Sequence, residues 1–142
     1  MDGYGEFTMY HTYQPFNQVC YKGNIAQIHS TSGDINISYM ENGYVNNIFV
    51  KEDEITPIPL TIELLDKLIG NRKTNMDDFI LRFEKGTYIV RVKLEADDSW
   101  TVSVNDKNDK KVKYLHELQN YIRCNANKHI LFLVNNSNAL TI

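Results

Sequence analysis

"KYLHELQNYIRC", residues 113–124, decides the fold of this chain, because its spacing predicts the helix around which the other elements are arranged. An α-helix turns once in about 3.6 residues, so side chains three or four positions apart share a face. The apolar side chains in and beside this stretch share such a face: Val112, Leu115, Leu118 and Ile122. We expect Lys113, Glu117 and Asn120 to face away from that stripe. The pattern predicts a helix over residues 111–124 that covers the apolar face of a sheet.

Three strands of that sheet are predicted before the helix. Apolar and polar residues alternate in them, as they do in a strand with one buried face: DFILRFE (78–84), TYIVRVKLE (87–95) and SWTVSVN (99–105). Turns are expected at Lys85–Gly86 and at Asp97–Asp98. After the helix, KHILFLVNN (128–136) predicts a buried C-terminal strand. This half is therefore expected to be an antiparallel sheet covered by one or two helices.

The first half of the chain is expected to be all-β. Four short runs are rich in Ile, Val and Tyr: NQVCYKG (17–23), NIAQIHS (24–30), DINISYM (34–40) and GYVNNIFVK (43–51). Turns are predicted between them at Gly23–Asn24, Ser32–Gly33 and Asn42–Gly43, and Asn-Gly is the strongest of these hairpin signals. Short strands at this spacing predict a small SH3-like barrel.

A proline-bearing connector separates the two halves. Pro57 and Pro59 each remove a backbone donor, so this segment cannot continue a central strand. Thr61 is the expected N-cap of a short helix that closes at Gly70, and 71–78 is a polar loop. The predicted fold is α+β, with an SH3-like β subdomain over 1–58. The remaining subdomain, 59–142, contains a helix, a β-meander, the covering helix and the C-terminal strand.

The helix contains HExxN, one letter from the HExxH of zinc proteases. In HExxH the two histidines bind one metal ion and the glutamate acts as general base. Here Asn120, a poor zinc ligand, stands in the second position after His116 and Glu117. Cys20 and Cys124 are far apart and belong to no CxxC pair. We therefore predict no metal site, no cofactor and no catalytic residue, and we expect His116 and Glu117 to form a polar shoulder beside the core stripe.

Charge and hydropathy narrow the functional classes. The formal net charge of −3 lacks the positive excess that sequence-independent nucleic-acid binding needs. The start, MDGYGEF, lacks the basic and apolar regions of a signal peptide, and no apolar run approaches the roughly 20 residues of a membrane span. We expect a soluble intracellular protein that does not enter a membrane.

Two motifs in order carry a family resemblance: ITPIPLT at 55–61 and VKYLHELQN at 112–120. The chain resembles a family of small uncharacterised proteins from Bacteroidota phages, prophages and mobile elements, which share I-x-P-I-P-L-T and V-K-Y-x-H-E-L-Q-N. The resemblance covers residues 45–120, and the chain departs from the family pattern after that. It implies an α+β layout with an SH3-like start and action in the host cytoplasm. It hands over no catalytic residue.

The best candidate for a site is the polar face of the predicted meander. Alternation places there a set of cationic and hydroxyl side chains: Arg82, Arg91, Lys93, Thr101 and Ser103. The loop residues Arg72 and Lys73 would extend the set at its edge. Guanidinium groups and hydroxyls suit phosphate oxygens, so the pattern predicts a site for a phosphate-bearing small molecule. The alternative is an ordinary solvated face with edge-protecting charges.

Three functions follow from these observations. The first is a non-catalytic binding protein of a phage or mobile element, a counter-defence factor that sequesters a nucleotide-derived signal or blocks a host protein. The second is a protein–protein adaptor or self-assembling module that presents aromatic side chains: Tyr21, Tyr39, Tyr44 and Phe49. The third is a metal-dependent hydrolase whose site is assembled from distant residues. The lack of nucleophile, P-loop and dinucleotide motifs favours a binding protein over an enzyme. A homo-oligomer is also expected, because chains with this many aromatic residues that could lie at the surface often pair.

Overall fold

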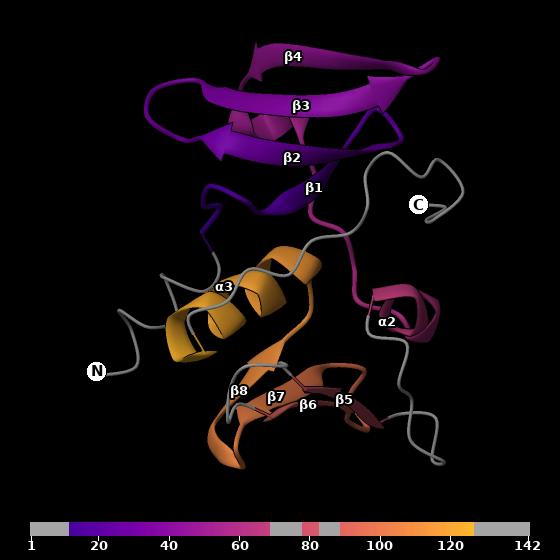
Figure 1. Ribbon diagram of the computed structural model, residues 1–142, viewed down its shortest axis with the longest axis vertical. Helices are drawn as coiled ribbons and strands as arrows, with labels where there is room; N and C mark the ends of the chain where they lie inside the picture. The colour runs from indigo at the N-terminus through magenta and orange to yellow at the C-terminus, as the bar shows by residue number, and fades with distance from the viewer. Residues whose placement is uncertain (1–11, 69–77, 83–88, 127–142) are drawn as a thin grey trace.

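The computed structural model describes residues 12–68, 78–82 and 89–126. In this part of the chain the fold is α+β, with two antiparallel sheets of four strands each and a helix, α3 (Leu115–Ala126). Figure 1 shows α3 lying between the first sheet, above it, and the second sheet, below it. The predicted α+β class is confirmed.

The first sheet is a meander whose strands follow chain order. They are β1 (Gln18–Tyr21), β2 (Asn24–Ser30), β3 (Ile35–Glu41) and β4 (Tyr44–Val50). Asn42 and Gly43 join β3 to β4 with φ angles of 54° and 82°. Asn and Gly tolerate this left-handed geometry, which matches the twist of a two-residue hairpin. The predicted turn at Asn42–Gly43 is confirmed.

The SH3-like barrel is not confirmed, because the first sheet stays open in the described residues. A barrel closes when its first and last strands pair with each other. Here β1 and β4 lie at opposite edges of the sheet. The outer side of β1 is taken by Thr56: the Cys20 N–H donates to the Thr56 oxygen over 2.8 Å, and the Thr56 N–H donates to the Cys20 oxygen over 3.0 Å. The connector thus occupies the edge that closure would need.

The second sheet is also a meander in chain order. It contains β5 (Asp78–Arg82), β6 (Ile89–Leu94), β7 (Trp100–Val104) and β8 (Lys107–Val112). The prediction that a helix begins at residue 111 is wrong, because β8 continues to Val112. Asn105 and Asp106 turn the chain back after β7 with φ angles of 52° and 61°. The sequence did not predict this strand, because only Val112 in it is buried and the strand therefore lacks the alternation of apolar and polar residues.

The connector ties both sheets together. Beyond its pairing with β1, it pairs with the start of α3: the Leu60 N–H donates to the Lys113 oxygen over 2.9 Å, and the Leu115 N–H donates to the Ile58 oxygen over 2.8 Å. The two motifs at 55–61 and 112–120 therefore lie side by side. The connector is extended from Ile55 on, as expected, but its first residues form a short 3₁₀ helix, η1 (Glu52–Glu54).

The short helix α2 (Ile62–Leu68) follows the connector. Thr61 caps it as predicted, because its Oγ1 accepts the Leu64 N–H over 3.0 Å. Three other predictions lie outside the described residues: the helix end at Gly70 with its loop, the Lys85–Gly86 turn and the strand over 128–136.

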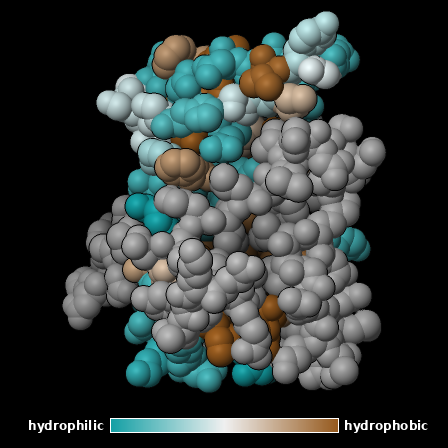
Figure 2. Space-filling model, in the orientation of Figure 1, coloured by the Kyte–Doolittle hydropathy of each residue, from teal (hydrophilic) through white to brown (hydrophobic). Residues whose placement is uncertain are grey.

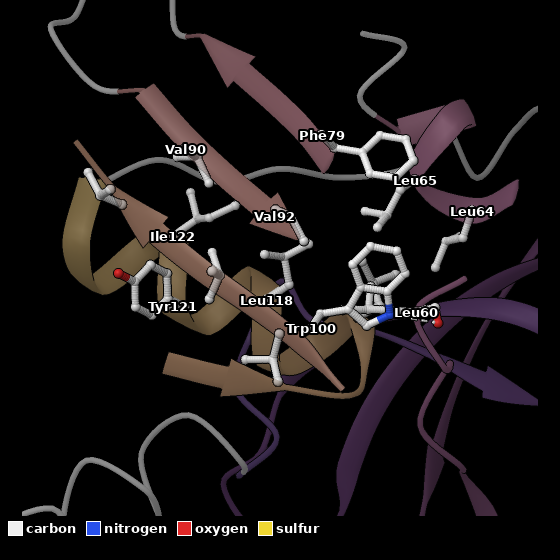
Figure 3. Close-up of a cluster of buried hydrophobic side chains, with 14 of the residues drawn as sticks. Leu60, Leu64, Leu65, Phe79, Val90, Val92, Trp100, Leu118, Tyr121 and Ile122 are labelled. Carbon is white, nitrogen blue, oxygen red and sulfur yellow. Dashed lines mark hydrogen bonds between the residues drawn. The ribbon is translucent and has the colours of Figure 1, made fainter. Parts of the chain in front are cut away.

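Two apolar clusters fill the interior. The smaller cluster lies within the first sheet and ends at Ile55. The larger one begins at Ile58 and joins the connector, α2, the second sheet and α3. In Figure 3, Leu118 and Ile122 of α3 point toward β6, the strand that carries Val90 and Val92. The Trp100 indole lies beside Leu60 and donates its Nε1–H to the Leu60 oxygen over 3.2 Å.

Candidate functional site

The polar residues of HELQN are buried between α3 and the first sheet. His116, Glu117, Gln119 and Asn120 are each no more than 5% exposed. The Asn120 Oδ1 accepts the Asn17 Nδ2–H over 2.8 Å, and the Asn120 Nδ2–H donates to the Thr12 oxygen over 2.9 Å. Glu117 and Asn120 therefore lie off the apolar stripe, as predicted, but both side chains are buried. These side chains face a second layer of protein that the helical pattern alone could not reveal.

Gln119 makes a matching pair of contacts with β1. Its Oε1 accepts the Gln18 N–H over 2.9 Å, and its Nε2–H donates to the Gln18 Oε1 over 3.1 Å. Gln18 is itself fully buried. Since buried amides are costly unless they are hydrogen-bonded, this arrangement fixes one orientation of the first sheet on α3.

Glu117 closes the N-terminal end of α3. Its Oε1 accepts the Lys113 N–H over 2.7 Å and the Tyr114 N–H over 3.1 Å. This is the glutamate half of a capping box, in which a carboxylate three residues into the helix satisfies backbone donors before it. The glutamate of HExxN therefore has a structural role here.

His116 lies among aromatic rings. Its ring centroid is 4.7 Å from that of Tyr13 and 6.0 Å from that of Tyr114. Burial, followed by the nearby Glu52 and Tyr114, raises the pKa of the Tyr13 phenol. Within residues 12–68, 78–82 and 89–126, no group of three or more His, Cys, Asp and Glu side chains is placed so that it could hold a metal ion.

The outer face of the second sheet brings together four of the predicted ligand-binding residues. Arg91, Lys93, Thr101 and Ser103 line one shallow depression of about 340 Å³. The strand register explains this, because Arg91 lies opposite Ser103 and Lys93 lies opposite Thr101. Arg82 lies in β5 opposite Ile89, but its side chain is outside the described part of the structure. Arg72 and Lys73 also lie outside the described residues.

Three carboxylates that sequence reasoning missed share this depression: Glu95, Asp106 and Asp109. The Thr101 hydroxyl donates to the Glu95 Oε2 over 2.6 Å. The wall of the depression is therefore of mixed charge, where the sequence predicted a cationic one. The Asn105–Asp106 dipeptide, a left-handed turn signal, could have identified β8 and so placed Asp109 on this face.

The β6–β7 turn lies at one end of the same sheet, and an Asp97 carboxylate organises it. The Ser99 hydroxyl donates to the Asp97 Oδ1 over 2.5 Å and the Ser99 N–H donates to the same oxygen over 3.1 Å. On the other side, the Lys111 Nζ is 3.2 Å from the Asp97 Oδ2. The hydrogen bonds from Ser99 and then Lys111 hold the pKa of Asp97 well below its ordinary value of 3.8.

A larger depression, of about 450 Å³, lies at one end of the first sheet. Tyr13, Asp34 and Lys51 are among the residues that line it. The Lys51 Nζ and the Asp34 Oδ1 are 3.6 Å apart, and both side chains are well exposed. Such an exposed pair contributes little stability.

β4, an edge strand of the first sheet, carries exposed apolar side chains and is a further candidate site. Tyr44, Val45 and Phe49 are 75%, 68% and 70% exposed. The first sheet, at the top of Figure 2, carries brown hydrophobic residues among teal hydrophilic ones on the visible surface. Of the four aromatic residues predicted for an adaptor surface, Tyr44 and Phe49 are exposed. Tyr21 is buried and packs against Tyr39 at a ring distance of 5.2 Å.

Comparison of the chain with protein-family models, with curated proteins and with solved structures finds no match. Among the described residues, every helix is too short or too polar to cross a membrane.

Proposed function

We propose that this protein is a non-catalytic binding protein that takes up a strand of another polypeptide along β4. On the basis of the family resemblance, we also propose that it is a phage or mobile-element protein that acts in the host cytoplasm as a counter-defence factor. Strand addition at a sheet edge gives affinity through main-chain hydrogen bonds and specificity through alternate side chains.

The observation that carries the proposal is the exposure of Val45 and Phe49 on an edge strand. Large apolar side chains are uncommon on exposed edge strands. The unpaired N–H and C=O groups of such an edge can pair with any other strand, and apolar side chains would favour that pairing. Scattered exposed apolar residues are common, but these two lie on the same strand and the same face, with Asn47 between them.

Amide hydrogen exchange resolved by residue tests the proposal. The full chain is purified from the cell that produces it and examined by native mass spectrometry and NMR. We expect a bound polypeptide and amides of Val45, Asn47 and Phe49 that exchange about tenfold more slowly than in an uncovered edge. Asn47→Lys should remove both signals, while Ile89→Lys, which adds the same charge on the second sheet, should keep them. Rapid exchange at all three amides, whatever protein co-purifies, would contradict the proposal.

A second candidate function is sequestration of a nucleotide-derived small molecule on the outer face of the second sheet. It is favoured by the convergence of Arg91, Lys93, Thr101 and Ser103 on one depression. The carboxylates there require a ligand whose phosphate is accompanied by donor groups, because a bare phosphate would meet repulsion from Asp106 and Asp109.

Thermal unfolding with a nucleotide panel tests this second candidate. A ligand that binds only the folded state raises the Tm by mass action. We expect the rise to vanish in Arg91→Ala and to persist in Lys51→Ala, which removes an exposed cation from the first sheet. A panel without any Tm rise would leave the β4 edge as the sole proposed surface.

A further inference from the structure

The two sheets end in strands of opposite character. β4 reads YVNNIFV and carries no charged side chain, whereas β8 reads KNDKKV and carries three lysines and an aspartate. Charged residues, especially lysine, keep an exposed edge from pairing with another strand. β8 therefore has the protection that an edge in water needs, and β4 lacks it.

The backbone groups that β4 offers follow from its hairpin. Glu41 and Tyr44 flank the two-residue turn and face each other, so they form a hydrogen-bonded pair. Hydrogen-bonded and non-bonded pairs then alternate along an antiparallel ladder. As a result the N–H and C=O groups of Val45, Asn47 and Phe49 point away from β3, toward the open side of the sheet.

We propose that the strand paired with this edge is β4 of a second copy of the chain, antiparallel and related by a two-fold axis at Asn47. The inference rests on the proposed function and names its partner. In this register Asn47 faces the partner's Asn47, and Val45 faces the partner's Phe49. Every outward N–H and C=O of the three residues then meets an outward group of the other copy.

The side chains fit the same register. Asn36 donates from its Nδ2 to the Asn47 Oδ1 over 2.8 Å, which places Asn47 on the outer face of the sheet next to Phe49, the register partner of Asn36. Val45 lies on the same face, since residues two apart do. Across the two-fold axis, an exposed Val side chain and an exposed Phe side chain would cover each other twice. Aromatic and β-branched cross-strand pairs of this kind stabilise sheets.

A second copy is favoured over another occupant by charge and pattern together. The edge needs an extended, uncharged strand with apolar side chains four residues apart on one face, and β4 itself has that pattern. Self-pairing brings no like charges together along the strand. The same operation on β8, with its axis at Lys110, would place two lysines opposite each other, so self-pairing is favoured at β4 over β8.

Cysteine cross-linking tests the register. In a hydrogen-bonded antiparallel pair the two Cα atoms are about 5.5 Å apart, within the range that a disulfide spans. With the exposed Cys124 replaced by serine, Asn47→Cys should form a disulfide-linked dimer under mild oxidation. Val45→Cys should not, because its two copies would be about 13 Å apart along the strand. A mixture of Val45→Cys and Phe49→Cys chains should cross-link. Cross-linking of Val45→Cys to itself, or none at Asn47→Cys, would overturn the register.

A charge exchange tests the dimer independently of cross-linking. Sedimentation should find the wild-type chain and Ile89→Lys as dimers. Asn47→Lys and Asn47→Asp should each be monomers, with dimer dissociation constants raised about 100-fold or more, because like charges meet at the axis. An equal mixture of the two variants should dimerise again, which a folding defect would not do.

The outcomes separate this inference from the proposed function. A monomeric wild-type chain, together with protection of the Val45, Asn47 and Phe49 amides by a different polypeptide, overturns the second copy and leaves strand uptake standing. A monomer whose three amides exchange freely overturns both.

Discussion

On the side of α3 that faces the second sheet, Leu115, Leu118 and Ile122 are fully buried in one apolar cluster. On the side that faces the first sheet, Gln119 and Asn120 are equally buried but meet Gln18 and Asn17 through amide hydrogen bonds. Apolar burial supplies most of the folding free energy, whereas exchanging hydrogen bonds with water for internal ones supplies little. The second sheet therefore gives α3 most of its stability, and the first sheet gives it a defined orientation.

The largest expected loss of stability comes from a substitution on the apolar side of α3. Leu118→Ala removes a fully buried side chain and leaves a cavity between α3 and the second sheet. We expect the free energy of unfolding to fall by about 2–5 kcal/mol, measured by urea denaturation. Leu118→Met, which conserves the volume, should cost less than about 1.5 kcal/mol. Equal losses in both variants would argue against tight packing at this site.

A smaller effect is expected on the amide side. Asn120→Ala leaves the Asn17 Nδ2 and the Thr12 oxygen without their contacts to Asn120. We expect a loss of about 1–3 kcal/mol, and a double-mutant cycle with Asn17→Ala should give a coupling energy of about 0.5–3 kcal/mol. Asn125→Ala is the control, because the Asn125 Nδ2–H donates to the Tyr121 oxygen of its own helix. A loss as large as that of Leu118→Ala would erase the difference between the two sides.

A substitution at the N-terminal end of α3 should reduce the free energy of unfolding by less than those on either side of the helix. Glu117→Ala removes the oxygen that accepts the Lys113 and Tyr114 N–H groups. We expect a loss of about 1 kcal/mol and faster exchange of those two amides. Glu117→Gln keeps an acceptor in place and should lose less. If Glu117→Ala left both amides as slow as in the wild type, the cap would not be the cause of their protection.

The smallest effect concerns a turn of the second sheet and its dependence on pH. Because the folded-state pKa of Asp97 is depressed, its stabilising contribution is present above the unfolded pKa, near 4, and is lost as the pH falls through the lower folded value. The NMR titration of Asp97 should therefore have its midpoint below that of an ordinary aspartate. In Asp97→Asn the fall in Tm below about pH 5 should be shallower. Since Asp97 is exposed, the difference should be small, and an ordinary midpoint would show that Ser99 and Lys111 do not hold it.

The difference between the two sides of α3 also explains what the sequence could predict. The apolar stripe with Leu115, Leu118 and Ile122 follows from helical spacing, so the packing of this helix on a sheet was predictable. Gln119 and Asn120 look like solvent-facing residues in the helical pattern. Their partners lie 101 to 108 residues away, and no local rule connects positions so distant.

The same contrast holds for the candidate site. Alternation along β6 and β7 correctly placed Arg91, Lys93, Thr101 and Ser103 on one face, because strand periodicity is local. It missed Asp106 and Asp109, since β8 is an exposed strand whose lysines conceal any alternation. The edge character of β4 also needed the sheet order, as a sequence does not say which strand comes last in a sheet.

The amide contacts have a consequence for the nascent chain. Asn17 leaves the ribosome 103 residues before Asn120, a delay on the order of 5–20 s at typical synthesis rates. During that delay the surface of the first sheet that will contact α3 is exposed to water. Its amide groups, including those of Asn17 and Gln18, can hydrogen-bond to water at little cost. An apolar surface in the same place would favour aggregation before α3 is synthesised. The polar contact surface therefore helps to keep the N-terminal half from aggregating until synthesis is complete.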